Sequence, residues 1–432
     1  MKGDFTRNTF NPKNHYSRVL MQQGRVQLDA DWNEQGAILL HTLRSLAADL
    51  IGEHGGPGDG FKIMAVAARK NDFKIGQGHY YVQGVLAEND AENAFYKDQA
   101  GFPPLENNKT YVAYLDVWER HITSIEDDDI REKALGGPDT ATRAKVVWQV
   151  KIKEDPNREG RAFKGEYQQF LNFLNGTPPP TVARIQARAM KSPQNDNEPC
   201  LIAPESRYRG PENQLYRVEI HKSGALGQAG APVPTFKWSR ENGSVIFPIK
   251  TVEGLKVTLE HLGRDARFGL KPEDWVEIVN DDSVLQNRAG GLWQIESLDT
   301  ISLQVTLKPK AGAQPLQVLE GDTKHPLLRR WESQEVNAAI PTTNDGWIPL
   351  EYGVEVKFGN GAYRSGDYWL IPARTATGDV EWPGPVKTPD EVPPHGVAHH
   401  FAPLAIISVG ADGAVTTAVA DDLRRKLKQS WE

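Results

Sequence analysis

The stretch "AKVVWQVKIK", residues 144–153, decides the class of fold. Apolar side chains alternate here with polar ones, so that Val146, Trp148, Val150 and Ile152 share one side and Lys145, Gln149, Lys151 and Lys153 the other. A period of two residues is typical of a β-strand with one buried face and differs from the period of a helix. We therefore predict a strand whose apolar side, including Trp148, faces a core.

Similar short runs continue on both sides of this strand, separated by glycine, asparagine and proline. They are found at residues 61–89, 109–122, 213–221, 274–282, 291–299, 301–309, 352–373 and 401–419. The run 213–221 alternates in the same way, with Tyr216, Val218 and Ile220 against Arg217, Glu219 and His221. Such spacing predicts a mainly β protein with a few helices, built as several sandwich-like or barrel-like domains.

The stretch "FKWSRENGSVIFPI", residues 236–249, predicts a β-hairpin. Asn242–Gly243 supplies the two residues with positive φ that a type I′ turn needs, and strand-like residues flank it. Trp238, like Trp148 and Trp293, lies in an alternating run, so we expect these three side chains to pack in cores and not to form a platform for a sugar.

A helix is predicted for "DWNEQGAILLHTLRSLAADLIG", residues 31–52. Asp31 is a good N-cap, and Glu34 three residues later completes a pattern that resembles a capping box. Trp32, Leu39, Leu43, Leu46 and Leu50 recur at steps of three and four residues after a first step of seven, so they lie on one stripe of the helix. Gly52 is a plausible stop. Residues 1–30 before it are expected to form an extended arm.

The length of 432 residues suggests about three domains as a prior. We predict an arm and helix at 1–60, a β-rich domain at 61–155, a connector at 156–200, a second β-rich domain at 201–350 and a third at 351–432. Within the connector, "GEYQQFLNFLN" at residues 165–175 suggests a short helix.

The composition limits the possible partners and compartments. A formal net charge of −7 does not favour a broad basic surface for nucleic acid. The single cysteine, Cys200, excludes a disulfide within the chain and a multi-cysteine zinc site, and we expect it to be buried. We found neither a signal-peptide core near Met1 nor a run of about 18 apolar residues, so we expect synthesis in the cytoplasm without membrane insertion.

Candidate chemical groups were weighed against simpler structural roles. His395, His399 and His400 lie in a segment rich in proline, so a loop of packed or partner-facing histidines is favoured over a metal site. The acidic run 126–129 and the pair Asp281–Asp282 are expected to be solvated turns. The sequence contains no G-x-S-x-G, phosphate-binding loop or dinucleotide-binding motif. We therefore predict no catalytic residues, metal or cofactor.

The amino-terminal sequence "GDFTRNTFNPKNHYSRVLMQQGRVQLDADWNEQ", residues 3–35, resembles an uncharacterised family encoded with phage-tail-like contractile injection systems. A looser pattern in it is similar to the start of some phage tail and fibre proteins. Its elements are Phe10, Pro12, Tyr16, Val19, Gln23, Gly24, Arg25, Val26, Asp31, Asn33 and Glu34, with Asn14 where the pattern has lysine. The resemblance extends to later segments, including residues 114–151 and 362–383. It implies a contractile particle as the setting and no catalytic residue.

We therefore expect a structural subunit near the baseplate or fibres of such a particle, forming a homo-oligomer and contacting other subunits. The predicted partner-binding residues are Phe10, Pro12, Tyr16, Gln22, Gln23, Arg25, Asp29 and Trp32. The helical stripe would pack either on its own body or on copies of itself. A glycan-binding or receptor-binding fibre module is the alternative function, followed by an effector carried in the particle.

Overall fold

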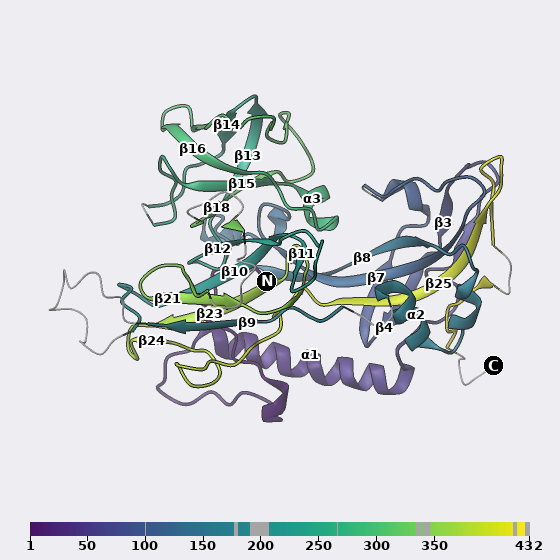
Figure 1. Cartoon of the computed structure of the whole chain (residues 1–432), viewed down its shortest axis with the longest axis horizontal. Coiled ribbons are helices and arrows are strands. Elements are labelled where there is room, and N and C mark those ends of the chain that lie inside the picture. Colours follow the sequence, from purple (N-terminus) through teal and green to yellow (C-terminus); the bar gives the residue numbers. More distant parts are fainter. Residues whose placement is uncertain are drawn as a thin grey trace. The chain divides into compact units, whose positions relative to one another are not determined.

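The computed structural model describes residues 1–99, 101–176, 180–190, 207–265, 267–333, 338–339, 346–417 and 421–427. In these ranges the protein is mainly β with three α-helices, which confirms the predicted fold class (Figure 1). Cys200 and part of the predicted connector lie outside the described residues, so the expected burial of this thiol stays a prediction.

The chain divides into two compact units, each built from segments that are far apart in sequence. Unit 1 comprises Met1–Asn8, His121–Arg143 and Thr181–Val397, and unit 2 comprises Thr9–Arg120, Ala144–Pro180 and Ala398–Glu432. The contiguous division predicted from the sequence differs from this arrangement. Strand pairing joins segments across the predicted boundaries, and local patterns carry no information about such long-range pairs.

A four-stranded sheet in the order β26–β25–β7–β8 runs through unit 2. Its strands are β7 (Thr110–Ile122), β8 (Arg143–Glu154), β25 (His399–Val409) and β26 (Val415–Thr416). β25 pairs antiparallel with β7, from His399 opposite Trp118 to Ser408 opposite Thr110. In β8, Val150 is buried in the core, and Val146, Trp148 and Ile152 pack against the same core, as the alternation predicted.

Two three-stranded sheets complete the β-structure of unit 2. Their strands are β1 (His54–Gly55), β4 (Gly78–Val82) and β5 (Val85–Asn89) in one sheet, and β2 (Ile63–Ala65), β3 (Phe73–Ile75) and β6 (Ala94–Phe95) in the other. The helices of this unit are η1 (Pro12–Asn14), α1 (Asp29–Ile51), η2 (Tyr96–Asp98), η5 (Glu159–Phe163) and α2 (Tyr167–Asn175). Buried aromatic residues, among them Phe61, Phe73, Tyr80 and Tyr96, fill the main core.

Unit 1 contains a β-sandwich. One sheet has the order β19–β12–β10–β23–β24 and the other the order β20–β21–β9. The strands are β9 (Ile185–Ala189), β10 (Gln214–Lys222), β12 (Thr235–Ser239), β19 (Ala338–Ala339), β20 (Ile348–Pro349), β21 (Val354–Phe358), β23 (Tyr368–Arg374) and β24 (Asp379–Val380). Tyr216, Val218 and Ile220 of β10 share one core with residues of β9 and β21, so the two sheets pack face to face.

A closed six-stranded barrel is inserted between β12 and β19 of the sandwich (Figure 1). Its strands are β13 (Ile246–Glu253), β14 (Lys256–Leu259), β15 (Trp275–Val279), β16 (Leu292–Asp299), β17 (Gln304–Leu307) and β18 (Leu327–Trp331). The remaining elements of unit 1 are η3 (Asp128–Ile130), η4 (Lys133–Leu135), β11 (Gly224–Leu226), α3 (Asp281–Leu285) and β22 (Gly361–Tyr363). The barrel has its own core, which includes Trp293.

The predicted turn at Asn242–Gly243 exists, but the predicted hairpin does not. Both residues have positive φ, 49° and 65°, and the Ser244 N–H donates to Glu241 O over 2.9 Å, as in a type I′ turn. However, β12 pairs with β10 and β19, whereas β13 pairs with β14 and β18. The turn therefore redirects the chain from the sandwich into the barrel, and the strands on either side separate.

The first eight residues belong to unit 1 and not to the arm that follows them. The Met1 carbonyl accepts hydrogen bonds from Arg217 Nη1 at 3.3 Å and from Asn242 Nδ2 at 3.1 Å. Gly3 is buried, and its carbonyl accepts from Asn242 Nδ2 at 2.9 Å. The predicted segment 1–60 is thus divided between the two units near Asn8.

Candidate docking surface

Helix α1 begins two residues before the predicted start. Its N-cap is Leu28, which makes no side-chain capping hydrogen bond, so the prediction of Asp31 as the cap is wrong. Asp29 and Asp31 lie in the first turn, where negative charge stabilises the helix dipole. Glu34 does not close a capping box, because its carboxylate accepts a hydrogen bond from Thr9 Oγ1 at 2.5 Å.

One side of α1 faces the body of unit 2. Ala30 and Ile38 are buried on this side, with 1% and 2% of their surface exposed. Arg44 donates two hydrogen bonds to Glu119 of β7, at 2.8 and 3.2 Å. Gly84 has a φ of 78° and approaches the Arg44 carbonyl so closely that an added Cβ would lie 2.1 Å from its oxygen. Two buried apolar side chains, an ion pair and backbone contact therefore hold the helix.

The opposite side of α1 exposes the apolar stripe that the sequence predicted. Trp32 is 70% exposed, and the four leucines of the stripe are 54–75% exposed: Leu39, Leu43, Leu46 and Leu50. The neighbouring Leu40 is 40% exposed. Of the two placements expected for this stripe, packing on its own body is not seen against the described residues of unit 2, and packing on copies of itself stays a prediction. A contiguous exposed apolar surface of this kind marks a site of interaction with another molecule.

Helix α2 in the same unit places its apolar side inward. Phe170 is fully buried and packs with Phe163 and Tyr114, at ring-centroid distances of 5.9 and 6.2 Å. Its partners include Leu423 and Ile406, which come from distant parts of the chain. Both helices were predicted from the sequence, yet only α2 places its large apolar side chains in the core of its own unit.

The arm before α1 folds back on the amino-terminal half of the helix (Figure 1). In addition to Thr9, Val19 contacts it, donating its N–H to Gln35 Oε1 at 2.8 Å, and the Phe10 ring lies 5.6 Å from the His41 ring. The arm exposes further apolar side chains, namely Tyr16, Leu20, Met21, Val26 and Leu28. We use "docking surface" for these five residues together with Trp32, Leu39, Leu40, Leu43, Leu46 and Leu50.

The predicted partner-binding residues fall into two groups. Most are exposed in this surface or beside it: Pro12, Tyr16, Gln22, Gln23, Arg25, Asp29 and Trp32. Phe10 is half-buried and contacts His41, so it anchors the arm to its own helix. Sequence reasoning did not place Leu20, Met21, Val26 and Leu28 among the partner-binding residues, although an apolar residue in a polar arm is the signal that could have identified them.

The histidines and acids considered as metal ligands occupy separate places. His399 and His400 are not in a loop but begin β25, where His399 Nδ1 lies 2.8 Å from Asp116 Oδ1 and His400 Nδ1 lies 2.7 Å from Gln83 Oε1. Asp127 caps η3, and Asp281 begins α3 instead of a simple turn. Across the described ranges, no three His, Cys, Asp or Glu side chains are arranged to hold a metal ion.

Sequence reasoning missed a buried ionic cluster in unit 1. It comprises Lys2, Arg217, Glu219, Lys237 and Glu277, and it connects β10 and β12 of the sandwich to β15 of the barrel. Glu219 Oε2 lies 2.6 Å from Arg217 Nε, and its Oε1 lies 3.0 Å from Lys2 Nζ and 3.4 Å from Lys237 Nζ. Lys237 Nζ in turn lies 2.6 Å from Glu277 Oε2, which also accepts from Trp331 Nε1 at 2.9 Å.

The cluster keeps its carboxylates charged. Burial alone would raise the pKa of Glu219, but Lys2, Arg217 and Lys237 outweigh it and hold that pKa well below the usual value. His221, on the same strand, shows the opposite balance, because burial lowers its pKa to about 4. Its Nδ1 is buried without a hydrogen-bond partner. The polar side of β10 is therefore an interior face and not a solvated one.

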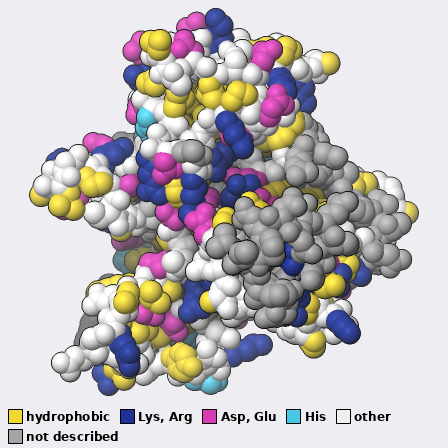
Figure 2. Space-filling model, turned by 90° about the vertical axis from the view of Figure 1, so that its left-hand side faces the viewer, with side chains coloured by type: hydrophobic (Ala, Val, Ile, Leu, Met, Phe, Trp, Pro, Cys, Tyr) yellow, Lys and Arg dark blue, Asp and Glu magenta, His cyan; other side chains and the backbone are white. Residues whose placement is uncertain are grey.

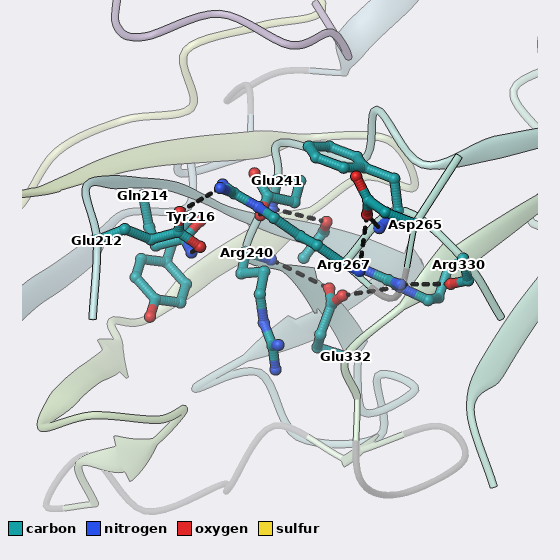
Figure 3. A network of polar contacts seen from close by, with 12 residues as sticks. Glu212, Gln214, Tyr216, Arg240, Glu241, Asp265, Arg267, Arg330 and Glu332 are labelled. Atoms are coloured by element: carbon teal, nitrogen blue, oxygen red, sulfur yellow. Dashed lines mark hydrogen bonds and ion pairs between the residues drawn. The ribbon is translucent and has the colours of Figure 1, made fainter. Parts of the chain in front are cut away.

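A second polar network in unit 1 connects Arg240, Arg267 and Arg330 to glutamate residues (Figure 3). Arg240 Nη2 donates to Glu351 Oε2 at 2.8 Å, and its backbone N–H donates to Glu332 Oε2 at 3.1 Å. Burial raises the pKa of Glu332 and Glu351 in spite of the neighbouring arginines. Arg267 connects Glu212 and Glu241. An arginine contacts each of these carboxylates, so we assign this network a structural role.

The charged side chains on one face of the molecule are mixed in sign (Figure 2). Lysine and arginine lie beside aspartate and glutamate, and the described atoms on this face form no broad basic track of the kind that nucleic acid requires. None of the helices in the described residues is long and apolar enough to cross a membrane.

Comparison with known families covers almost the entire chain. The match spans residues 1–165 and 167–418. The chain belongs to the family described as "Family of unknown function (DUF6519)". The match of this DUF6519 protein covers all of unit 1 and most of unit 2, including α1 and the ionic cluster. A comparison with curated proteins gave no match.

Proposed function

We propose that this protein is a structural subunit that assembles with other chains through the docking surface. The observation that supports this proposal is the outward orientation of the apolar stripe of α1. Fully burying a leucine stabilises a contact by about 1.5–3 kcal/mol, and the stripe forgoes this gain in the isolated chain. An assembly in which the stripe is covered would recover it.

The setting that we propose is a phage-tail-like contractile particle, near its baseplate or fibres. Support comes from the resemblance of residues 3–35, which contain the arm and the start of α1. Trp32 and Tyr16 are the aromatic side chains expected to anchor the contact, because large aromatics supply much of the binding energy in interfaces. Gln22, Gln23 and Arg25 would supply hydrogen bonds at its edge.

The test replaces leucines of the stripe without removing the arm, because a deletion would also remove Gly3, which is buried in unit 1. The variant carries Leu39→Gln, Leu43→Gln and Leu46→Gln. The matched control carries Leu135→Gln, Ile301→Gln and Leu319→Gln, which replace side chains exposed by 68%, 94% and 79% elsewhere.

Tagged chains are expressed at native level in the natural host, and the particles that contain them are purified and viewed by electron microscopy. We expect tail-like particles with the native chain and with the control, and loss of the chain from particles with the stripe variant. Equal occupancy of the stripe variant would contradict docking through α1. Particles of another kind would contradict the proposed setting.

A further inference from the structure

The exposed stripe of α1 has the spacing of a helix–helix seam. Its positions are 32, 36, 39, 43, 46 and 50, which alternate steps of four and three residues without a break. This average period of 3.5 residues is that of the a and d positions at which two helices pack along their lengths. A groove in a β-protein or an extended peptide would impose no such period.

Gly36 occupies one of these six positions and has no evident role within its own chain. It lies several residues from either end of the helix and is exposed to solvent, and a Cβ added there would meet nothing within 4 Å. Glycine in a helix interior costs about 1 kcal/mol relative to alanine. A glycine on the seam instead accommodates a large side chain of a partner helix, so the helix that packs here should present one opposite Gly36.

We infer that the partner is a second copy of this chain, whose α1 packs antiparallel to the first. This inference rests on the proposed function, because it names the occupant of the docking surface. An antiparallel pair centred on residue 41 forms three kinds of layer. They join Trp32 to Leu50 of the other copy, Gly36 to its Leu46, and Leu39 to its Leu43.

The side-chain sizes favour this direction over the parallel one. In the antiparallel pair, the missing side chain of Gly36 faces Leu46, so that small and large residues alternate across the seam. A parallel pair would place Gly36 against Gly36 beside a layer of two Trp32 rings. It would also bring the first turns of both helices together, and each carries Asp29 and Asp31. Two helices of opposite direction avoid that repulsion.

The charges along the seam favour a copy of the same chain over a charged partner helix. The flanking positions are 33, 35, 40, 42, 47 and 49, and only Asp49 among them is charged. Helices that select a partner through ion pairs carry charges at these positions. Since this helix has almost none, two identical helices meet almost no repulsion along the seam. In the antiparallel pair, Asp49 lies near the uncharged Gln35 of the other copy.

The exposed area is sufficient for a reversible dimer. Trp32 and the four leucines of the stripe, with 54–75% of their surface exposed, present on the order of 600 Å² of apolar surface on each copy. A pair would bury roughly 1,200 Å², which is the lower limit for stable protein interfaces. We therefore expect dissociation constants in the micromolar range, so that both states are measurable.

Cysteine cross-linking tests the partner and its direction together. Two purified full-length chains are prepared, one with Trp32→Cys and the other with Leu50→Cys, each with Cys200→Ser to remove the single native thiol. Mixing them under mild oxidation should give the mixed cross-linked dimer. In a parallel pair, the two positions would lie about 27 Å apart, because 18 helical residues rise by that amount. Self-cross-linking of the Trp32→Cys chain without the mixed product, or no cross-link at all, would overturn the inference.

A size swap at the seam gives an independent test by analytical ultracentrifugation. Gly36→Leu should weaken dimerisation at least tenfold, because the new side chain collides with Leu46 of the other copy. Adding Leu46→Ala in the same chain should restore most of the affinity. Circular dichroism confirms that each variant is folded. Undiminished dimerisation of Gly36→Leu, or no recovery in the double variant, would overturn the antiparallel pairing.

These results separate the inference from the proposed function. A native chain that stays monomeric while the stripe variant is lost from particles contradicts the pairing alone. A dimer that forms as described, with the stripe variant still present in particles at full occupancy, contradicts only the proposed role of the stripe in bringing the chain into the particle.

Discussion

The ionic cluster on β10 and the stripe on α1 both depart from the usual arrangement of polar and apolar side chains, in opposite ways. Glu219 is a buried charge, with 3% of its side chain exposed, and three cations of the same unit lie within 3.4 Å. Leu43 is an exposed apolar residue, with 62% of its surface in solvent. The cluster is complete within the chain and the stripe is not. A buried charge or an exposed apolar side chain therefore indicates an external partner only where contacts within the same chain do not compensate for it.

The largest expected effect comes from removing the central anion of the cluster. Glu219→Ala leaves Arg217 and Lys237 buried without their shared partner, and breaking a buried pair in this way costs about 3–5 kcal/mol. Unit 1 should unfold at lower urea concentration, as followed by tryptophan fluorescence. Glu253→Ala, on an exposed part of the barrel, is the control and should leave the midpoint unchanged. Equal stability of both variants would show that the cluster is not a structural element.

Acid should act on the same face of β10 through His221. Its pKa is about 4 in the folded protein and 6.5 ordinarily, so the unfolded chain binds the proton more readily between these values. The contribution of His221 to the free energy of unfolding is therefore fully present above about pH 6.5 and is lost as the pH drops towards 4. At 1.36 kcal/mol per pKa unit, this loss is about 3 kcal/mol.

Urea unfolding of the native chain and of His221→Gln at pH 7 and pH 4.5 measures this contribution. The variant should show a smaller difference between the two pH values. His121 and His395, whose pKa values burial lowers to about 3 and 4, should keep part of the acid sensitivity. An unchanged difference in the variant would exclude His221 as a source of the sensitivity.

A moderate effect of opposite sign is expected on the stripe. Gly36→Ala should stabilise the monomer by about 1 kcal/mol, because alanine is the better helix former and nothing within 4 Å obstructs its Cβ. Thermal unfolding at concentrations below the dimer dissociation constant checks this value. A destabilised monomer would mean that Gly36 has a contact within its own chain.

The smallest effect on monomer stability is expected for the replacement of an exposed leucine of the stripe. Leu43→Gln should alter monomer stability by no more than about 0.5 kcal/mol, as for most surface substitutions. Leu115→Gln is the matched control in the same unit, where the leucine is fully buried, and it should destabilise unit 2 severely. A large loss of stability in Leu43→Gln would show that the stripe serves its own fold and would remove the main support for docking.

The sequence was informative wherever the structure is local. The alternation in residues 144–153, the helix with its apolar stripe and the turn at Asn242–Gly243 all follow from near neighbours along the chain. The hairpin failed because the partners of β12 and β13 are distant strands. The role of Arg217 and Glu219 was missed for the same reason, since strand alternation separates two faces but does not say which of them meets solvent. Here the barrel covers the polar face of β10.

The pairing of β25 with β7 has a consequence for how the protein is made. Thr110 and Ser408 lie opposite each other although 298 residues separate them. At a synthesis rate of roughly 5–20 residues per second, the ribosome needs roughly 15–60 s to produce the missing strand. Helix α1 forms from local contacts much earlier. The leucines of its stripe are therefore exposed to solvent in nascent chains while β7 still lacks its partner strand β25. Slower growth at low temperature, or chaperones that shield α1, should raise the yield of correctly folded protein from a foreign host.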